Sequence, residues 1–192
     1  MSVTTNYFIR ELTPELLDDY LSFFDHVAFA DNPKWASCYC YFPHAPHDTE
    51  KWHDRTGDQN RAAVIDLISQ GRMHGYLAFQ NEKPIAWCNA GPRMRVTILD
   101  EDEDKEKIGS IICFVVARAH RGKGVARRLL EAACDGFRRQ GYAIVEAYPR
   151  PDAHDDATSH FGPLKMFLAT GFQPFKEDNG SIIVRKTLEC AD

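Results

Sequence analysis

Residues 108–149 constrain the fold more than any other stretch, because two apolar segments in it flank an amphipathic one. The segment IGSIICFVVA (108–117) is continuously apolar, which is typical of a central strand covered on both faces. Residues 125–141 then place apolar side chains at helical spacing and end with a glycine. The segment YAIVEAYP (142–149) follows as a second strand. Because a helical crossover joins them, the two strands are predicted to be parallel neighbours in one sheet.

The segments on either side of this unit predict a mixed sheet flanked by helices. Thr13 and Pro14 mark the start of a helix, and Asp178-Asn179-Gly180 is a strong hairpin turn. Residues 30–55 follow neither period and are predicted to be irregular. The other expected elements are strands at 6–11, 75–80, 84–91, 172–175 and 181–186, and helices at 14–29, 58–70 and 163–170. The expected class is α/β, with a mixed α+β sheet in a single domain over residues 1–192.

Composition limits the partners of the chain. Its 192 residues carry a net charge of −5, of which residues 100–107 (DEDEDKEK) contribute −4 from six acids and two lysines. The remaining −1 argues against nucleic acid or an anionic membrane as the main partner. We find neither a signal peptide nor the ~20 apolar residues of a membrane helix. The six cysteines, without a secretion signal, indicate reduced thiols in a cytoplasmic protein. We expect a monomer or homodimer.

A basic, glycine-containing turn joins the central strand to the helix after it. Its sequence is RGKGVA (121–126), and Arg127 and Arg128 follow. Glycines in such a turn let backbone N–H groups approach a ligand, and the start of a helix favours a phosphate. The turn is neither a Walker P-loop nor the glycine pattern of a dinucleotide fold. Taken alone, it indicates either a phosphate site or an ordinary basic turn.

In its strand-turn-helix setting, this turn resembles the acyl-CoA motif [RQ]-x-x-G-x-[GA] of the GNAT superfamily of N-acetyltransferases. Arg121, Gly124 and Ala126 match its defining positions, the order of elements fits along the whole chain, and Gly171-Phe172 matches the end of the fourth helix. The resemblance implies the GNAT fold and direct transfer of the acetyl group of acetyl-CoA to a primary amine of a small molecule. The alternatives are a non-catalytic acyl-CoA-binding or sensor domain, or acetylation of a protein or peptide amine.

The resemblance also implies where acetyl-CoA binds as co-substrate. The pyrophosphate would lie on the N–H groups of residues 122–127, and the pantetheine arm would pair with the strand edge at 114–116, beside a bulge. We expect the N–H of Val116 to stabilise the tetrahedral intermediate. No metal is expected, because acetyl transfer from a thioester needs none. The expected cofactor-binding residues are Phe114, Val115, Val116, Arg121, Gly122, Lys123, Gly124, Val125, Ala126 and Arg127.

The chain departs from the family at the proton donor. Many members have an asparagine and, seven residues on, a tyrosine that protonates the CoA thiolate, whereas this chain has His160 and Phe167. Phenylalanine cannot donate a proton, so Tyr148 and His160 are the candidate acids, unless both are structural. Glu146 is the one carboxylate inside an apolar strand. It is either the base that deprotonates the amine or a partner in a structural ion pair.

The stretch CYCYFPHAPH (38–47) contains paired cysteines and paired histidines. Their spacing could hold zinc, but the aromatic residues around them, together with His44, favour a wall of the acceptor pocket. Trp87 and Arg93 could border the same pocket, or could be a core tryptophan and a surface arginine. The expected acceptor-binding residues are Trp35, Tyr39, Tyr41, Phe42, Trp87 and Arg93.

Overall fold

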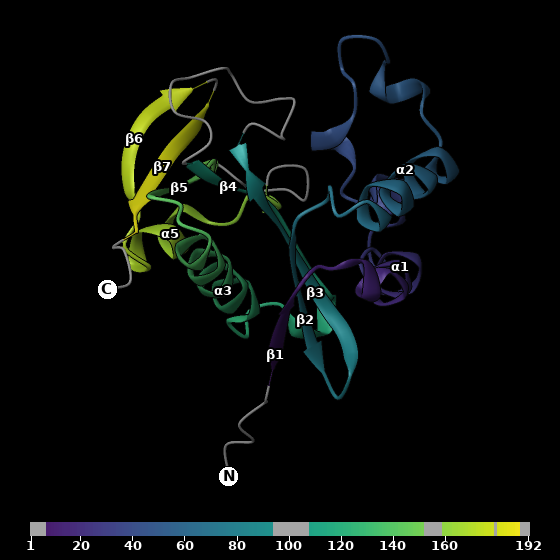
Figure 1. Cartoon of the computed structure of the whole chain (residues 1–192), viewed down its shortest axis with the longest axis horizontal. Coiled ribbons are helices and arrows are strands. Elements are labelled where there is room, and N and C mark those ends of the chain that lie inside the picture. The colour runs from purple at the N-terminus through teal and green to yellow at the C-terminus, as the bar shows by residue number, and fades with distance from the viewer. Residues whose placement is uncertain (1–6, 94–107, 152–158, 179, 189–192) are drawn as a thin grey trace.

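The computed structural model describes residues 7–93, 108–151, 159–178 and 180–188, which form one seven-stranded sheet (Figure 1). The strand order is β1-β2-β3-β4-β5-β7-β6, and the pairs are antiparallel except for β4 with β5. The strands are β1 (Phe8–Glu11), β2 (Gly75–Gln80), β3 (Lys83–Pro92), β4 (Ile108–Val116), β5 (Ile144–Ala147), β6 (Gln173–Asp178) and β7 (Ser181–Thr187). The predicted parallel pair and the mixed α/β class are confirmed. The acidic run 100–107 and Asn179 lie outside the described residues.

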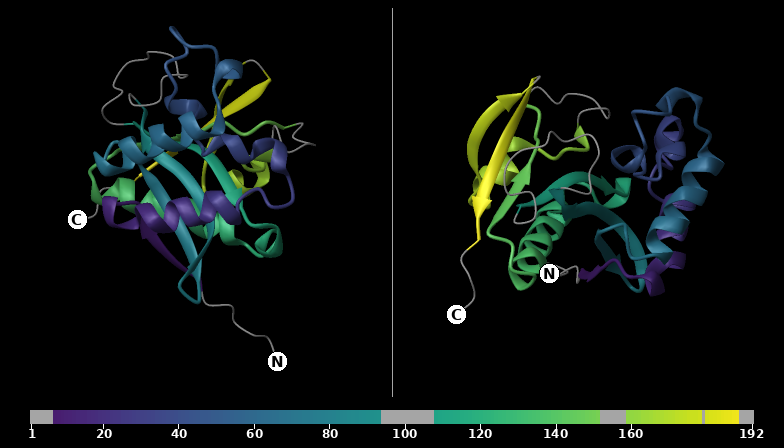
Figure 2. Two further views of the ribbon diagram at one scale, coloured as in Figure 1. Left: turned by 90° about the vertical axis from the view of Figure 1, so that its right-hand side faces the viewer. Right: turned by 45° about the horizontal axis from the view of Figure 1, so that its top comes forward.

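Helices cover both faces of the sheet and divide its core into two clusters (Figure 2). The helices are α1 (Leu17–His26), α2 (Gly57–Ser69), α3 (Val125–Arg139) and α5 (Leu164–Ala169). The α1–α2 core contains the fully buried Tyr20, Phe23 and Trp87, and the α3–α5 core contains Leu129 and Phe167. Because successive side chains of a strand point to opposite faces, the central strands contribute to both cores. Among the described helices, none combines the length and apolarity needed to cross a lipid bilayer.

The parallel strands β4 and β5 stay together over only part of their length. β5 ends at Ala147, opposite Ile111, whereas β4 runs on to Val116. On the other side of β4, the pairing with β3 skips Ile112 after Asn89, which makes Ile112 a bulge. A bulge increases the local twist and leaves backbone groups unpaired. The strands therefore separate where the resemblance to GNAT enzymes places the pantetheine arm.

One helix boundary differs from the sequence-based prediction. The first helix opens with a 3₁₀ turn at Pro14–Leu16, and α1 ends at His26 instead of continuing to residue 29. The N–H groups of Val27 and Ala28 both donate to the carbonyl of Phe23. Ala28 is fully buried, so the chain leaves the helix to bring this residue into the core.

Residues 30–55 fold into short 3₁₀ helices, in keeping with their lack of periodicity. These helices are Pro33–Cys38, Phe42–His44 and Trp52–Asp54. Between the first two, Tyr39 and Cys40 both adopt left-handed backbone conformations (φ 47° and 49°), each costing about 1–2 kcal/mol. The Tyr20 hydroxyl donates to the Tyr39 carbonyl at 2.7 Å, and the Tyr39 hydroxyl donates to Asp25 at 2.8 Å. These bonds hold the turn, and Cys40 is buried in the α1–α2 core.

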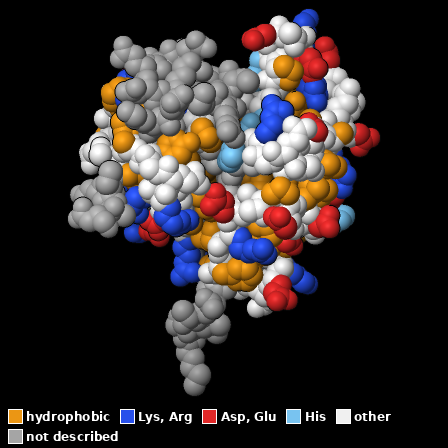
Figure 3. Space-filling view, in the orientation of Figure 1, with side chains coloured by type: hydrophobic (Ala, Val, Ile, Leu, Met, Phe, Trp, Pro, Cys, Tyr) orange, Lys and Arg blue, Asp and Glu red, His pale blue; other side chains and the backbone are white. Residues whose placement is uncertain are grey.

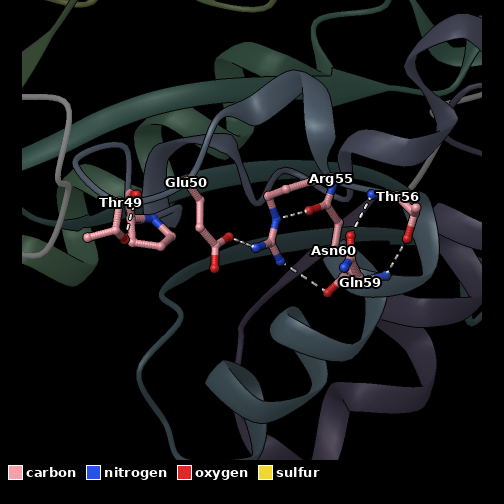
Figure 4. Close-up of polar contacts among 7 residues, drawn as sticks. Thr49, Glu50, Arg55, Thr56, Gln59 and Asn60 are labelled. Carbon is pink, nitrogen blue, oxygen red and sulfur yellow. Dashed lines mark hydrogen bonds and ion pairs between the residues drawn. The ribbon is translucent and has the colours of Figure 1, made fainter.

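A reciprocal cap starts α2 directly after this segment (Figure 4). The Thr56 hydroxyl accepts from the N–H of Gln59 at 3.2 Å, and the Gln59 side chain accepts from the N–H of Thr56 at 2.8 Å. Next to the cap, Arg55 donates to the Asn60 side chain at 2.8 Å and pairs with Glu50. The end of the irregular segment is thereby tied to the first turn of α2.

Thr56→Ala should therefore lower the free energy of unfolding by about 1 kcal/mol, the usual contribution of an N-cap side chain. Urea denaturation monitored by circular dichroism measures this change. Thr49→Ala is the matched control, because the Thr49 hydroxyl makes only an exposed bond of 3.4 Å to the Pro46 carbonyl. Equal losses in the two variants would contradict the stabilising role of the cap.

Candidate functional site

The turn between β4 and α3 presents backbone N–H groups to open space. Gly122 and Gly124 have positive φ angles (72° and 79°), which glycine adopts without strain. A Cβ built at either position would have no neighbour within 4 Å. Gly124 is the N-cap of α3 and no side chain caps the helix, so the N–H groups of its first turn lack intrahelical partners. The turn therefore fits an anion such as a phosphate group.

Positive charge surrounds this turn. Lys123, Arg127 and Arg128 are exposed, while Val125 is buried and Ala126 partly buried, so these two anchor the helix to the sheet. The Arg127 guanidinium bonds to Glu131, one turn further along α3, at 2.9 Å. The lysine and the two arginines place three cationic side chains near the open N–H groups.

Arg121, the first residue of the turn, is bonded within the protein. Its guanidinium makes a two-pronged contact with Asp31, at 2.7 Å and 3.1 Å, and its Nε donates to the Val116 carbonyl at 2.9 Å. The Arg121 hydrogen bond is the main cause of the lowered pKa of Asp31. Arg121 thus links the start of the irregular segment to the end of β4.

The edge of β4 that faces away from β3 is already engaged at two points. The Phe114 N–H donates to the His160 carbonyl at 2.7 Å, and the Val116 carbonyl accepts from Arg121. Strand alternation directs the N–H of Val116 to the same side as that of Phe114. The side chain of Val115 points the other way from its neighbours, into the α1–α2 core. A pantetheine arm that pairs with Phe114 would have to replace the His160 carbonyl.

Phe167 occupies the position at which many GNAT enzymes have a tyrosine, and it is fully buried. Its ring packs against those of Phe114 and Phe172, with centroids 6.3 Å and 5.3 Å away. The His160 ring packs against that of Phe161 in a tilted arrangement, with centroids 4.0 Å apart. Position 167 therefore contributes packing and cannot supply a proton.

Glu146 lies at the centre of a buried polar group that we call the Glu146 cluster. Its Oε2 accepts from Arg185 Nε at 2.6 Å, and its Oε1 accepts from the Tyr148 hydroxyl at 2.7 Å. Arg93 Nε lies 3.5 Å from Oε1, and the Ser110 hydroxyl lies 3.2 Å from that of Tyr148. Glu146 is fully buried and Arg93 is 3% exposed, so Arg93 is not a surface arginine. The cluster unites two residues, Glu146 and Tyr148, that sequence reasoning put forward for separate roles.

The environment of Tyr148 keeps its hydroxyl protonated. Burial raises the pKa of Tyr148, the negative charge of Glu146 raises it further, and the hydrogen bond to Ser110 partly opposes them. At neutral pH the hydroxyl is therefore protonated, and it donates its hydrogen bond to Glu146.

The residues predicted for the acceptor wall divide into buried and exposed ones. Tyr41 is 8% exposed, and the fully buried Trp87 packs edge-on against Tyr20. Trp35 and Phe42 are each 38% exposed. Figure 3 shows hydrophobic and histidine side chains near the centre of one face of the molecule. Trp87 thus belongs to the core beneath the segment, whereas Trp35 and Phe42 present aromatic surface.

Asn89 of β3 contacts one cysteine and one histidine of residues 38–47. Its Nδ2 lies 3.1 Å from His44 Nε2 and 3.4 Å from Cys40 Sγ. Burial lowers the pKa of His44 to about 4, so this imidazole is neutral at pH 7. A hydrogen bond from the Cys113 thiol is the main cause of the lowered pKa of Cys40. In the part of the chain that the structure describes, no three His, Cys, Asp or Glu side chains are grouped to hold a metal ion.

Sequence reasoning missed several residues of these contacts, namely Arg185, Ser110, Asn89 and Asp31. Three of them left a signal, because Arg185, Ser110 and Asn89 are polar residues inside apolar strands. Placing β7 beside β5 would have set Arg185 opposite Glu146. Asp31 left no such signal, since it lies 90 residues from Arg121 in a segment without periodicity.

Comparison with known proteins agrees with this geometry. A model of the acetyltransferase (GNAT) family matches residues 15–161. A search of curated proteins found no relative of the sequence.

Similar solved structures include the PaiA N-acetyltransferase of Thermoplasma acidophilum in complex with coenzyme A (14% identity, TM-score 0.58, covering 95% of this chain and 99% of that chain). YncA of Salmonella typhimurium with its cofactor acetyl-CoA is 17% identical (TM-score 0.54, coverage 95% and 94%). The GNAT domain of S. lividans PAT is 20% identical (TM-score 0.57, coverage 94% and 89%). At these identities the likeness concerns the fold.

Removing the charge at the centre of the Glu146 cluster should destabilise the protein. Glu146→Gln removes the carboxylate that contacts both the buried Arg93 and the partly buried Arg185, which should cost about 3–5 kcal/mol of unfolding free energy. Guanidinium denaturation measures the loss, and Glu177→Gln, at an exposed position of β6, is the control. A loss below about 1 kcal/mol would show that the two arginines do not depend on Glu146.

Proposed function

We propose that this chain, which belongs to the acetyltransferase (GNAT) family, is an N-acetyltransferase that moves the acetyl group of acetyl-CoA to a primary amine of a small molecule. The observation that carries the proposal is the open turn at Gly122 and Gly124, because its helix start and cationic neighbours suit a pyrophosphate. Two similar structures contain coenzyme A or acetyl-CoA, which supports the same donor here.

Transfer within a ternary complex is the simplest reaction for this arrangement. The neutral amine attacks the thioester carbonyl, a C–N bond forms, the C–S bond breaks, and the nitrogen loses a proton to water. The CoA thiolate leaves readily, since a thiol has an unperturbed pKa of about 8.5. We propose that the N–H of Val116 stabilises the oxyanion, because it points to the side of β4 that β5 has left.

Within this reaction, we assign Tyr148 as the proton donor and Glu146 as the group that orients it. Both oxygens of Glu146 already accept hydrogen bonds, from Tyr148 and Arg185, which argues against Glu146 as a free base. Tyr148 lies at the point where β4 and β5 separate, since it follows Ala147 directly. His160 has the weaker case, because its ring packs against that of Phe161.

The acceptor side is proposed to be formed by residues 30–55 together with β3. The exposed Trp35 and Phe42 offer apolar contacts, and the neutral His44, held by Asn89, offers a hydrogen-bonding group. Such a surface suits a small amine with an apolar part better than a highly charged polyamine. We also propose a reducing, cytoplasmic setting, because the five described cysteines are free thiols.

Two observations would also fit a different function, a non-catalytic acyl-CoA sensor. In a non-catalytic acyl-CoA sensor, Phe167 in place of a tyrosine and the bond from Phe114 to His160 would both be expected. Release of CoA in the presence of a panel of amines distinguishes the two functions. Binding of acetyl-CoA without release of CoA for any amine would favour the sensor.

Gly124→Glu should abolish binding of acetyl-CoA, because it brings a side chain and a negative charge to the open turn. Isothermal titration calorimetry measures the affinity. Gly124→Asn is the control for backbone strain, since asparagine tolerates the positive φ and carries no charge. Unchanged affinity in Gly124→Glu would remove the proposed pyrophosphate site.

Tyr148→Phe should lower kcat by about 10- to 100-fold and leave KM for acetyl-CoA unchanged, because it keeps the ring and removes the hydroxyl that is the proposed proton donor. Steady-state kinetics with the best amine of the panel measures both constants. Ser110→Ala is the control, since it removes the weaker bond at 3.2 Å and keeps the hydroxyl of Tyr148. A kcat equal to that of the unmodified protein would exclude Tyr148 as the acid.

A further inference from the structure

Arg121 occupies the first position of the acyl-CoA motif, and its side chain, although 46% exposed, bonds to other parts of the protein. Two of its nitrogens bind the two oxygens of Asp31, and the third donates to the Val116 carbonyl. Paired contacts between a guanidinium and a carboxylate are shorter and more directional than single hydrogen bonds. Three of the five N–H donors of the Arg121 guanidinium are therefore bonded within the protein before any ligand arrives.

Arg121 connects the proposed acceptor side of the site with the proposed donor side. Asp31 lies directly before the 3₁₀ helices of residues 30–55, which are proposed to contact the acceptor. Val116 ends the strand whose edge is proposed to bind the donor, and Arg121 itself begins the phosphate-binding turn. The contact between Arg121 and Asp31 spans 90 residues of sequence and joins the two sides directly.

We infer that Arg121 is a positioning residue rather than a ligand of the pyrophosphate, and that Asp31 is the anchor through which it holds the turn open for acetyl-CoA. This inference rests on the proposed function, since it concerns the same cofactor site. The backbone of residues 122–127 and Lys123 would then bind the phosphates. Asp31 is negatively charged and should repel the phosphates of acetyl-CoA. By anchoring Arg121, it would nevertheless favour the binding of acetyl-CoA.

The two roles of Arg121 predict opposite signs for one substitution. Asp31→Asn removes a negative charge close to the phosphate site, so simple electrostatics predicts tighter binding. If Arg121 were a phosphate ligand held back by Asp31, freeing it would tighten binding further. If Arg121 positions the turn, the loss of its anchor should weaken binding of acetyl-CoA by about fivefold, against the electrostatic trend.

The test measures the affinity for acetyl-CoA by calorimetry at low and high salt. Glu131→Gln is the matched control, because it also neutralises a carboxylate paired with an arginine near the turn, that of Arg127. We expect Asp31→Asn to bind more weakly and Glu131→Gln to bind equally or more tightly. Asp31→Glu, which keeps the charge, should recover part of the affinity. Binding in Asp31→Asn that is unchanged or tighter overturns the inference.

A second variant separates positioning from general stability. Arg121→Gln keeps a donor for the Val116 carbonyl but loses the positive charge. The double variant Arg121→Gln/Asp31→Asn should weaken binding of acetyl-CoA no more than either single change does. Both variants should raise KM for acetyl-CoA and for the amine with little change in kcat, while the melting temperature falls only slightly. A kcat loss with both KM values unchanged also overturns the inference. If the unmodified chain binds no acetyl-CoA, the proposed function itself fails.

Discussion

The separation of β4 from β5 after Ile111 is the constraint on which the remaining architecture depends. Because β5 stops at Ala147, the backbone of β4 from Ile112 onward must find partners elsewhere. The His160 carbonyl and the Arg121 side chain supply two of them. A strand edge with exchangeable partners is a suitable place for an extended ligand, since backbone hydrogen bonds can be traded one for one.

Most of the fold could be predicted because its elements have strong periodicity. The apolar run of β4, the amphipathic α3 and the strand β5 determine a parallel pair with little ambiguity. The end of α1 could not be predicted, because it depends on the burial of Ala28, a tertiary effect. The left-handed backbone conformations of Tyr39 and Cys40 could not be predicted either, since neither residue type favours them.

The candidate site also contains a part that local sequence predicts and a part that depends on tertiary structure. The turn at 121–126 could be predicted from local sequence, because its chemistry is that of a short peptide at the start of a helix. The Glu146 cluster is assembled from strands distant in sequence, so one sequence revealed Glu146 and Tyr148 but not Arg185. Of the two alternatives for Arg93, a surface arginine is wrong, because Arg93 is buried beside the carboxylate of Glu146, whereas its place at the acceptor pocket stays a prediction.

The distance in sequence between Glu146 and Arg185 has a consequence for synthesis of the chain. Since a chain grows from its N-terminus, β5 emerges 39 residues before Arg185 can pair with Glu146. Until β7 is made, β5 is an edge strand, and its inward-pointing carboxylate opposes pairing with the wrong neighbour. The Glu146 cluster is thus completed only when the last strand of the sheet has been made.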